Sequence, residues 1–379
     1  MLPNLRTPDG HDHACAAHCN DLPTPALVVD AAITRRNIKR MADYAAAHGL
    51  RLRPHTKTHK SKRLARLQIE AGAAGLTVAK AGEAEEMGEA SADILVAYPA
   101  LDPARVRRLA ALARIASVRV AVDSGTAIAA LAAAATAART KIGLLIELDV
   151  GLGRTGVGTA EAALALAQLA SNTEGVRIDG LLCYPGHIWA PAAAQGPLLQ
   201  AVSARLAGAI ALWSSHGFEA RIVSGGSTPT AFQSHEVKPY TEIRPGTYVF
   251  NDMNTVQGGF CTLGDCAASI ICTVVSDAVR GQVVIDGGSK TFTNDVCIPA
   301  PDSGHGCIPK YPGARLIRLS EEHGQVDVSN CEKHPRVGER VTVIPNHICP
   351  CVNLQDAFWW CEADAAPQAV PVDARGKLS

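Results

Sequence analysis

The feature that most constrains the fold is a repeated alternation of short apolar runs with longer stretches rich in Ala, Leu, Arg and Glu. Short buried strands that alternate with helices imply βαβ units on a parallel sheet. Eight such units over roughly 200–250 residues fit a closed (β/α)8 barrel. An open doubly wound sheet is the structural alternative, and it would usually stop at about five to seven strands. The candidate strands are Ala26–Asp30, Leu50–Pro54, Gly75–Ala79, Asp93–Ala97, Ser117–Asp123, Ile142–Val150, Ile178–Tyr184 and Ala220–Ser224.

The pattern changes after about residue 255, where strand-like runs continue but the helical stretches disappear. Gly, Pro and Asn separate these later runs, which is typical of an all-β domain. The runs are Ala268–Val275, Gln282–Asp286, Ala314–Leu319, Gln325–Val328 and Glu339–Ile344. We therefore expect an N-terminal arm over residues 1–21, a barrel over 22–255, a β domain over 256–362 and a partly ordered tail over 363–379.

Composition limits the partners of the chain. Lys+Arg and Asp+Glu are balanced at 36 each in 379 residues, so no bulk charge favours nucleic acid or an anionic membrane. No apolar stretch approaches the roughly 20 residues of a membrane span, and the N-terminus lacks the apolar core of a secretory signal. The 12 cysteines are then expected to be free thiols in a reducing cytoplasm. The expected partner is a small molecule.

A lysine follows the second candidate strand, within the segment Arg53–Lys60. Residues at the C-terminal ends of barrel strands face the active site, so Lys57 is expected at the barrel mouth. A lysine in a partly desolvated pocket has a lowered pKa and can form a Schiff base with an aldehyde. A basic surface turn is the alternative. Lys80, at the end of the third strand, competes with Lys57 for the role.

Two further strand ends carry candidate ligand-binding groups. In Asp149–Val157, three glycines surround Arg154 and would let the backbone approach a ligand closely. In Cys183–His187, Tyr184 could pack on a flat ring and His187 could act as an acid, a base or a ligand. A plain βα loop and structural roles for Tyr184 and His187 are the alternatives.

Two segments resemble phosphate-binding loops. Ser224–Thr228 follows the eighth candidate strand, and Arg244–Tyr248 comes soon after it. Phosphate binding after strands seven and eight is frequent in barrels and uses backbone N–H groups and hydroxyls.

The β domain carries a His-x-Cys pair, His347 and Cys349. In an extended segment both side chains would project from one face. Imidazole and thiolate suit zinc, and two protein ligands leave positions open for Lewis-acid catalysis. A buried thiol and a solvated histidine are the alternative. A second group of possible metal ligands lies in the N-terminal arm and consists of His11, His13, Cys15, His18 and Cys19. We interpret this group as part of a mobile tail in preference to a metal site.

Taken in chain order, these motifs resemble the D-threonine aldolase / D-serine dehydratase family of fold-type III, alanine-racemase-like pyridoxal-phosphate enzymes. The resemblance extends over roughly residues 22–360. The segments that carry it are Leu22–Ala26, Arg53–Lys60, Asp149–Val157, Ser224–Thr228, Gly246–Tyr248, Glu322–Gly324 and the pair His347 and Cys349.

The resemblance implies that Lys57 carries pyridoxal phosphate, with Arg154 by the pyridine nitrogen and Tyr184 and His55 near the cofactor. It implies that a phosphate group is surrounded by Gly225, Gly226, Ser227, Thr228, Gly246, Thr247 and Tyr248. It also implies that His347 and Cys349 bind a divalent metal beside the substrate. Zinc is the expected ion, with manganese or magnesium as alternatives, and a homodimer is expected.

The expected activity is cleavage of 3-hydroxy D-amino acids. Aldolases of the family typically carry Asp two residues after the metal histidine, and the dehydratase branch carries Cys, so Cys349 favours a dehydratase that converts D-serine or D-threo-3-hydroxyaspartate to an oxo acid and ammonia. The segment Pro350–Leu354 resembles the aldolase branch. Retro-aldol cleavage to glycine and an aldehyde is therefore the alternative, with His59 or His187 as base.

Three other functions remain open from the sequence. An amino-acid racemase would need a second acid/base, usually a tyrosine of the β domain, but residues 261–379 contain only Tyr311. A non-catalytic cofactor carrier would normally lack the second domain and the metal pair. A zinc-dependent barrel hydrolase without pyridoxal phosphate is possible if Lys57 is structural.

Overall fold

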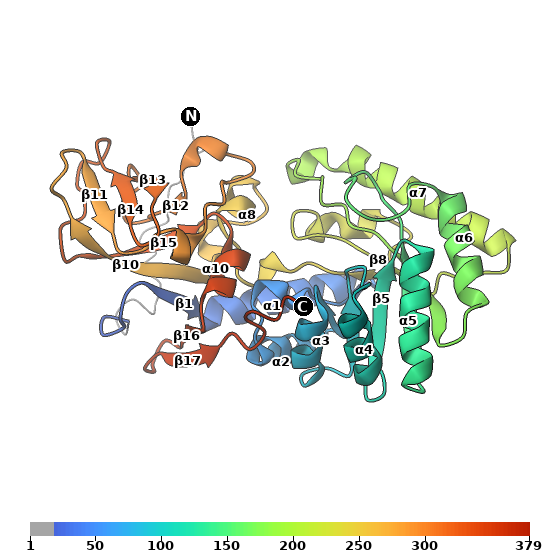
Figure 1. Cartoon of the computed structure of the whole chain (residues 1–379). Helices are drawn as coiled ribbons and strands as arrows, with labels where there is room; N and C mark the ends of the chain where they lie inside the picture. Colours follow the sequence, from blue (N-terminus) through green and yellow to red (C-terminus); the bar gives the residue numbers. More distant parts are fainter. Residues whose placement is uncertain (1–18) are drawn as a thin grey trace. The chain divides into compact units, whose positions relative to one another are not determined.

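The structure is a computed structural model that describes residues 19–379. Residues 11, 13, 15 and 18 of the N-terminal His/Cys cluster lie outside the described residues. The described chain forms two compact units (Figure 1). The barrel unit comprises Ile38–Gly246 and Gly376–Ser379, and the β unit comprises the residues up to Asn37 with Thr247–Arg375. These units differ from the predicted domains, because the segment before Ile38 belongs with the C-terminal half of the chain.

Eight parallel strands form the sheet of the barrel unit, in the order β2-β9-β8-β7-β6-β5-β4-β3. The ring closes between β2 and β3, where the Thr77 N–H donates a 2.9 Å hydrogen bond to the Pro54 carbonyl beside a parallel bridge from His55 to Thr77. The predicted fold class is thereby confirmed. The strands are β2 (Arg51–Leu52), β3 (Leu76–Val78), β4 (Asp93–Val96), β5 (Ser117–Val122), β6 (Ile142–Glu147), β7 (Val176–Leu182), β8 (Ile222–Gly225) and β9 (Glu242–Ile243).

Helices connect these strands and lie on the outside of the sheet (Figure 1). Their starts follow from local sequence: Asp102, Ser124 and Thr159 each accept a backbone N–H of the first turn and so cap a helix. No helix within residues 19–379 combines the length and the apolar character that a membrane crossing requires. The helices are α1 (Ala31–Ala47), α2 (Lys62–Glu70), α3 (Ala81–Gly88), α4 (Pro103–Leu112), α5 (Gly125–Ala137), α6 (Ala160–Ser171) and α7 (Gly196–Ser215).

One predicted barrel strand was wrong and one real barrel strand was missed. The first candidate, β1 (Ala26–Asp30), pairs antiparallel with β10 and parallel with β16 in the β unit. Its place in the barrel is taken by β9, which has only two residues and begins with a glutamate. Such a short polar strand carries no periodicity that sequence reasoning could detect.

The β unit is built on a nine-stranded sheet whose main path is β13-β14-β11-β10-β1-β16-β17, with β15 paired to β10 and β12. The five predicted runs of the β domain correspond to β10, β11, β13, β14 and β15. Three short helices accompany the sheet. The remaining elements are α8 (Met253–Gln257), β10 (Ala268–Ser276), β11 (Gln282–Ile285), α9 (Ser289–Phe292), β12 (Gly306–Cys307), β13 (Arg315–Leu319), β14 (Gly324–Asp327), β15 (Arg340–Pro345), α10 (Ile348–Leu354), β16 (Ala357–Cys361) and β17 (Gln368–Pro371).

The C-terminal tail contributes to the sheet, in contrast to the prediction that it is only partly ordered. β17 forms an antiparallel ladder with β16. Val370, Val372 and Ala374 are buried, and they supply apolar area that a polar, solvated tail would lack.

Buried charges, and not apolar side chains alone, fill part of the barrel interior. Arg53 is fully buried, and its Nε donates to Glu242 at 3.0 Å while its Nη1 donates to Asp93 at 2.7 Å. Asp93 also pairs with Arg119, which reaches Asp179 on β7. The network therefore ties together side chains of β4, β5, β7 and β9 with a residue that follows β2.

Removing the Arg53 side chain should strongly destabilise the protein, because the buried Glu242 would lose its cationic partner and Asp93 would keep only Arg119. We expect Arg53→Ala to lower the free energy of unfolding by about 3–5 kcal/mol, measured by urea unfolding followed by circular dichroism. The exposed Arg114 provides the control, since Arg114→Ala should change stability by less than about 0.5 kcal/mol. Equal effects of the two substitutions would contradict the role assigned to the network.

Candidate active site

A cavity of about 340 Å³ lies at the carboxyl ends of the barrel strands. This volume is within the roughly 300–1,000 Å³ typical of small-molecule sites. The side chains and backbone that line it come from the ends of seven different strands, as expected for the functional face of a barrel. They include His55, Lys57, Tyr98, Glu147, Arg154, Thr155, Tyr184, Gly226 and Arg244.

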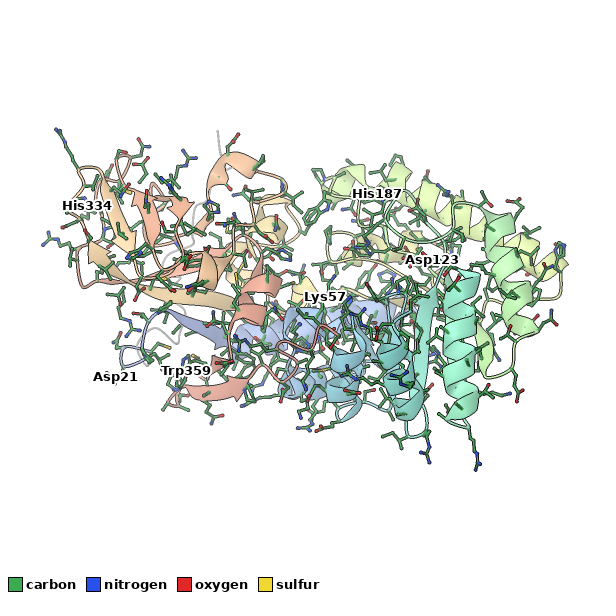
Figure 2. The ribbon with its side chains drawn as sticks, in the orientation of Figure 1. Asp21, Lys57, Asp123, His187, His334 and Trp359 are labelled. Carbon is green, nitrogen blue, oxygen red and sulfur yellow. The ribbon has the colours of Figure 1, made fainter. Side chains whose placement is uncertain are left out.

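Lys57 occupies a short 3-10 turn, Thr56–Thr58, that follows β2 (Figure 2). The turn is anchored from both sides: Thr56 Oγ1 donates to the Thr77 carbonyl at 3.1 Å, and the Lys57 N–H donates to His55 Nδ1 at 3.3 Å. Burial, with the neighbouring charges of Lys57 and Arg244, holds the pKa of His55 well below its usual range. His55 is therefore neutral beside the amine of Lys57.

Lys80 does not share this position. Its ammonium lies 3.4 Å from the centre of the Tyr98 ring. Tyr98 lines the cavity, but Lys80 is not among the lining residues. The geometry thus favours Lys57 over Lys80 as the lysine that could carry a covalent cofactor in the cavity.

The two predicted phosphate loops come together in the barrel unit. The Gly246 N–H donates to Thr228 Oγ1 at 3.3 Å, and the Ser227 hydroxyl lies 3.1 Å from that of Thr230. Gly225 has no room for a side chain, because a Cβ there would lie 2.2 Å from the Tyr240 ring, and Gly226 has a φ of +81°. Thr247 and Tyr248 follow directly in the chain, but they belong to the β unit.

Arg244 is a cavity residue that sequence reasoning missed. It is buried, with Nη1 donating to Ser224 Oγ at 2.7 Å and Nη2 donating to the Cys183 carbonyl at 2.8 Å. Arg154, the predicted cavity arginine, is exposed and lies over the Tyr184 ring at 5.0 Å. The cavity therefore holds two guanidinium groups, one fixed and one at the surface, where the sequence suggested one.

Glu147, at the end of β6, is the second missed residue. It is buried and accepts a 2.9 Å hydrogen bond from Thr155 Oγ1. Burial raises the pKa of Glu147, although the Thr155 hydrogen bond and the charges of Arg244 and Arg154 oppose this effect. A carboxylate at a barrel strand end was the available signal in the sequence.

The two histidines predicted as catalytic groups lie elsewhere. His59 is fully buried, with Nε2 at 3.2 Å from Gln68 and Nδ1 accepting the Ser61 N–H, and burial lowers its pKa to about 4. It is not among the residues that line the cavity, and these contacts favour a structural role over the predicted role as a base. His187 is exposed beside Gly151 and is not a lining residue of the cavity.

The candidate metal pair lies in the β unit, where His347 caps α10 and Cys349 belongs to its first turn. The prediction of an extended segment was wrong, yet the two side chains are within hydrogen-bond reach. His347 Nδ1 lies 2.7 Å from Asp295 Oδ2. Burial alone would lower the pKa of His347, but the interactions with Cys349, Asp252 and Asp295 raise it to about 9.

The surroundings of this pair suit a metal with few protein ligands. A ligating histidine commonly donates its second ring N–H to a carboxylate, which is the position of Asp295. The buried Asp252 accepts the Ile348 N–H at 3.1 Å and fixes the start of α10. Within residues 19–379 no group of three or more His, Cys, Asp or Glu side chains could hold an ion, so any metal here would have open positions.

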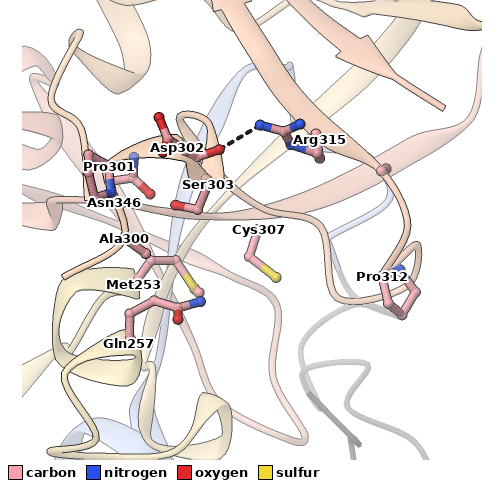
Figure 3. Close-up of a pocket in the computed structure, with 12 residues that line it drawn as sticks. Met253, Gln257, Ala300, Pro301, Asp302, Ser303, Cys307, Pro312, Arg315 and Asn346 are labelled. Carbon is pink, nitrogen blue, oxygen red and sulfur yellow. Dashed lines mark hydrogen bonds between the residues drawn. The ribbon is translucent and has the colours of Figure 1, made fainter. Parts of the chain in front are cut away.

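A second cavity, of about 520 Å³, also lies in the β unit (Figure 3). Met253, Cys307 and Pro312 are among its lining residues, and its one arginine, Arg315, donates to the Asp302 carbonyl at 2.5 Å. The cavity has no lysine in its lining, so it cannot hold an aldehyde cofactor covalently.

The buried Glu147 should make the stability of the protein depend on pH. Its pKa is higher in the folded than in the unfolded chain, so ionisation of Glu147 destabilises the folded state. This penalty is complete above the folded pKa and vanishes below the ordinary pKa of a glutamate, about 4.3. We expect Glu147→Gln to raise the thermal unfolding temperature at pH 8, with a gain that shrinks as the pH falls toward 4.5. Glu219→Gln, at an exposed position, is the control. A gain that does not depend on pH would contradict this explanation.

Comparison with known proteins assigns both halves of the chain. Residues 29–253 match the alanine racemase N-terminal domain, and residues 267–360 match a putative serine dehydratase domain. The chain is 31% identical to 3-hydroxy-D-aspartate aldolase of Paracoccus denitrificans over 94% of its length and 93% of that protein. It is 32% identical to D-threo-3-hydroxyaspartate dehydratase of Delftia sp., over 92% of this chain and 96% of the relative.

Solved structures agree with this assignment. D-threonine aldolase from Filomicrobium marinum superimposes with a TM-score of 0.85 at 30% identity, covering 94% of this chain and 97% of that one. Two variants of D-threo-3-hydroxyaspartate dehydratase have also been solved. In one, a histidine is replaced by alanine. In the other, a cysteine two positions after that histidine is replaced by alanine, and this structure is a metal-free form. The chain therefore belongs to the fold-type III, alanine-racemase-like family of pyridoxal-phosphate enzymes that includes D-threonine aldolase and D-serine dehydratase.

Proposed function

We propose that this protein is a pyridoxal-phosphate- and divalent-metal-dependent lyase of 3-hydroxy D-amino acids, and that it acts as a dehydratase. The observation that carries the proposal is a cavity at the barrel mouth that is lined by Lys57, by a neutral His55 and by Gly226. The lyase activities of relatives that span nearly the whole chain support it.

The residues of the cavity fit the cofactor. Gly225 and Gly226 keep side chains out of the loop after β8, and Ser227 and Thr228 offer hydroxyls there, as a phosphate group requires. Pyridoxal phosphate, when bound, supplies an aldehyde that joins amines covalently and a ring that acidifies the α-hydrogen of an attached amino acid. Lys57 Nζ would hold the cofactor and then remove the proton from the substrate α-carbon.

Two guanidinium groups are available to the cofactor and substrate. Arg154 was predicted beside the ring nitrogen, but Arg244 suits that role better because two hydrogen bonds hold it in place. β9, which precedes Arg244, also lies between the strand that leads to Lys57 and the strand that leads to the glycine loop. Arg154, exposed over Tyr184, is then free to bind the substrate α-carboxylate.

His347 and Cys349 would hold the metal, with Asp295 orienting the imidazole. A thiolate and an imidazole favour zinc over manganese or magnesium. A divalent ion at this position would supply Lewis acidity to the substrate 3-hydroxyl. The Delftia dehydratase supports this assignment, because its histidine and cysteine variants have the same spacing as His347 and Cys349.

Dehydration and retro-aldol cleavage differ in what happens to the 3-hydroxyl. In dehydration the hydroxyl leaves, and the products are an oxo acid and ammonia. In the aldolase reaction the hydroxyl loses its proton, and the products are glycine and an aldehyde. Cys349 in place of an aspartate favours dehydration, while the aldolase relatives and the segment Pro350–Leu354 keep the second activity as a candidate. Because His59 is buried, His187 is the remaining candidate for the base of the aldolase reaction.

The metal pair is tested by Cys349→Ala in the holoenzyme. We expect ammonia release from D-serine or 3-hydroxy-D-aspartate to be lost, no glycine to appear, and zinc binding to weaken. The visible absorbance of the lysine-bound cofactor should remain, because Lys57 belongs to the other compact unit. Asp295→Asn should reduce metal affinity or turnover by a smaller amount, about 10- to 100-fold.

Cys331→Ala is the matched control, because this cysteine lies in a different part of the β unit and should leave zinc content and turnover unchanged. Full activity of the wild-type protein after EDTA treatment would remove the metal from the mechanism. Glycine as the main product would replace the dehydratase assignment with the aldolase.

A further inference from the structure

A second group of cations borders the cavity on the side of β3 and β4. Lys80 caps α3 at the end of β3, Tyr98 follows β4, and Arg105 lies in the first turn of α4. The Lys80 ammonium lies 3.4 Å from the centre of the Tyr98 ring, and this ring lines the cavity. Interactions with Lys80, and to a smaller extent with Arg105, lower the pKa of the Tyr98 phenol.

This cluster has no anionic partner in the part of the chain that the structure describes. Neither Lys80 nor Arg105 forms a salt bridge among residues 19–379, and the buried Arg105 Nε has no hydrogen-bond partner there. The nearby Glu83 pairs instead with Lys60 at 3.0 Å. Buried polar groups are nearly always hydrogen-bonded, and the Arg105 Nε is a donor for which the described residues provide no acceptor.

A similar arrangement is found on the other side of the cavity. Arg154 lies over the Tyr184 ring, again without a carboxylate partner among the described residues. Two aromatic rings of the lining, Tyr98 and Tyr184, therefore each carry a cation that is unpaired by protein. An amino acid with one carboxylate needs one such cation, and a substrate with two carboxylates needs both.

We propose that Lys80, Arg105 and the Tyr98 hydroxyl form a subsite for a second, distal carboxylate of the substrate. The subsite rests on the proposed function, since Lys57 and the cofactor must hold the amino group of the same molecule. It selects 3-hydroxy-D-aspartate and similar dicarboxylic substrates over D-serine and D-threonine. Lys80, considered earlier as a competitor for the cofactor, thereby becomes a specificity-determining residue.

The test compares binding of D-aspartate and D-alanine to the holoenzyme. Neither carries a 3-hydroxyl, so neither can undergo the lyase reaction, and they differ in the distal carboxylate. Dissociation constants are obtained from the change in visible cofactor absorbance on titration. We expect the wild-type protein to prefer D-aspartate by about tenfold or more, the effect of one charge-assisted hydrogen bond. Lys80→Met should abolish this preference, and Lys80→Arg should retain part of it.

Lys141→Met is the matched control, because Lys141 is exposed and precedes β6 at the opposite end of the barrel. The Lys141→Met protein should prefer D-aspartate over D-alanine to the same extent as the wild type. A wild-type protein that binds both amino acids equally would overturn the subsite. The subsite would also be overturned if the Lys80→Met protein lost affinity for D-aspartate and D-alanine to the same extent. The cluster would then bind a group that the two amino acids share. A purified protein without a visible cofactor band would instead refute the proposed function itself.

Discussion

Arg53 is the buried charge on which the barrel depends, because it links the segment after β2 to β9 and β4 through Glu242 and Asp93. β9 has only two residues, and the ion pair adds a side-chain link to its backbone pairing with β2 and β8. The same Glu242 accepts a hydrogen bond from Ser224, which in turn accepts one from Arg244 in the cavity. One ionic network thus closes the barrel interior and fixes a cation of the site, so stability and preorganisation have a common physical origin.

The two compact units contribute different parts of the chemistry. The barrel unit supplies Lys57, a neutral His55, the glycine loop and Arg244. The β unit supplies His347 and Cys349, with Asp295 and Asp252 fixing the imidazole and the start of α10.

The parts that could be predicted from the sequence are those that local pattern determines. The βα alternation predicts the barrel, and the strand-end rule places Lys57 in the cavity. Arg244 and Asp295 could not be assigned roles in this way, because these roles depend on partners distant in sequence, as with Asp295 and His347. Glu147 was missed although it ends a barrel strand. The environment of His59 likewise depends on Gln68 and on burial, which the motif does not reveal.

The central claim is that an aldehyde cofactor is bonded to Lys57, and trapping that bond tests it most directly. Borohydride reduction of the purified protein makes such a bond permanent, and mass analysis of the digested chain locates it. We predict loss of the visible absorbance on reduction and one phosphopyridoxyl group on the peptide that contains Lys57. A label on Lys80, or a purified protein that carries no such group after incubation with pyridoxal phosphate, would contradict the account.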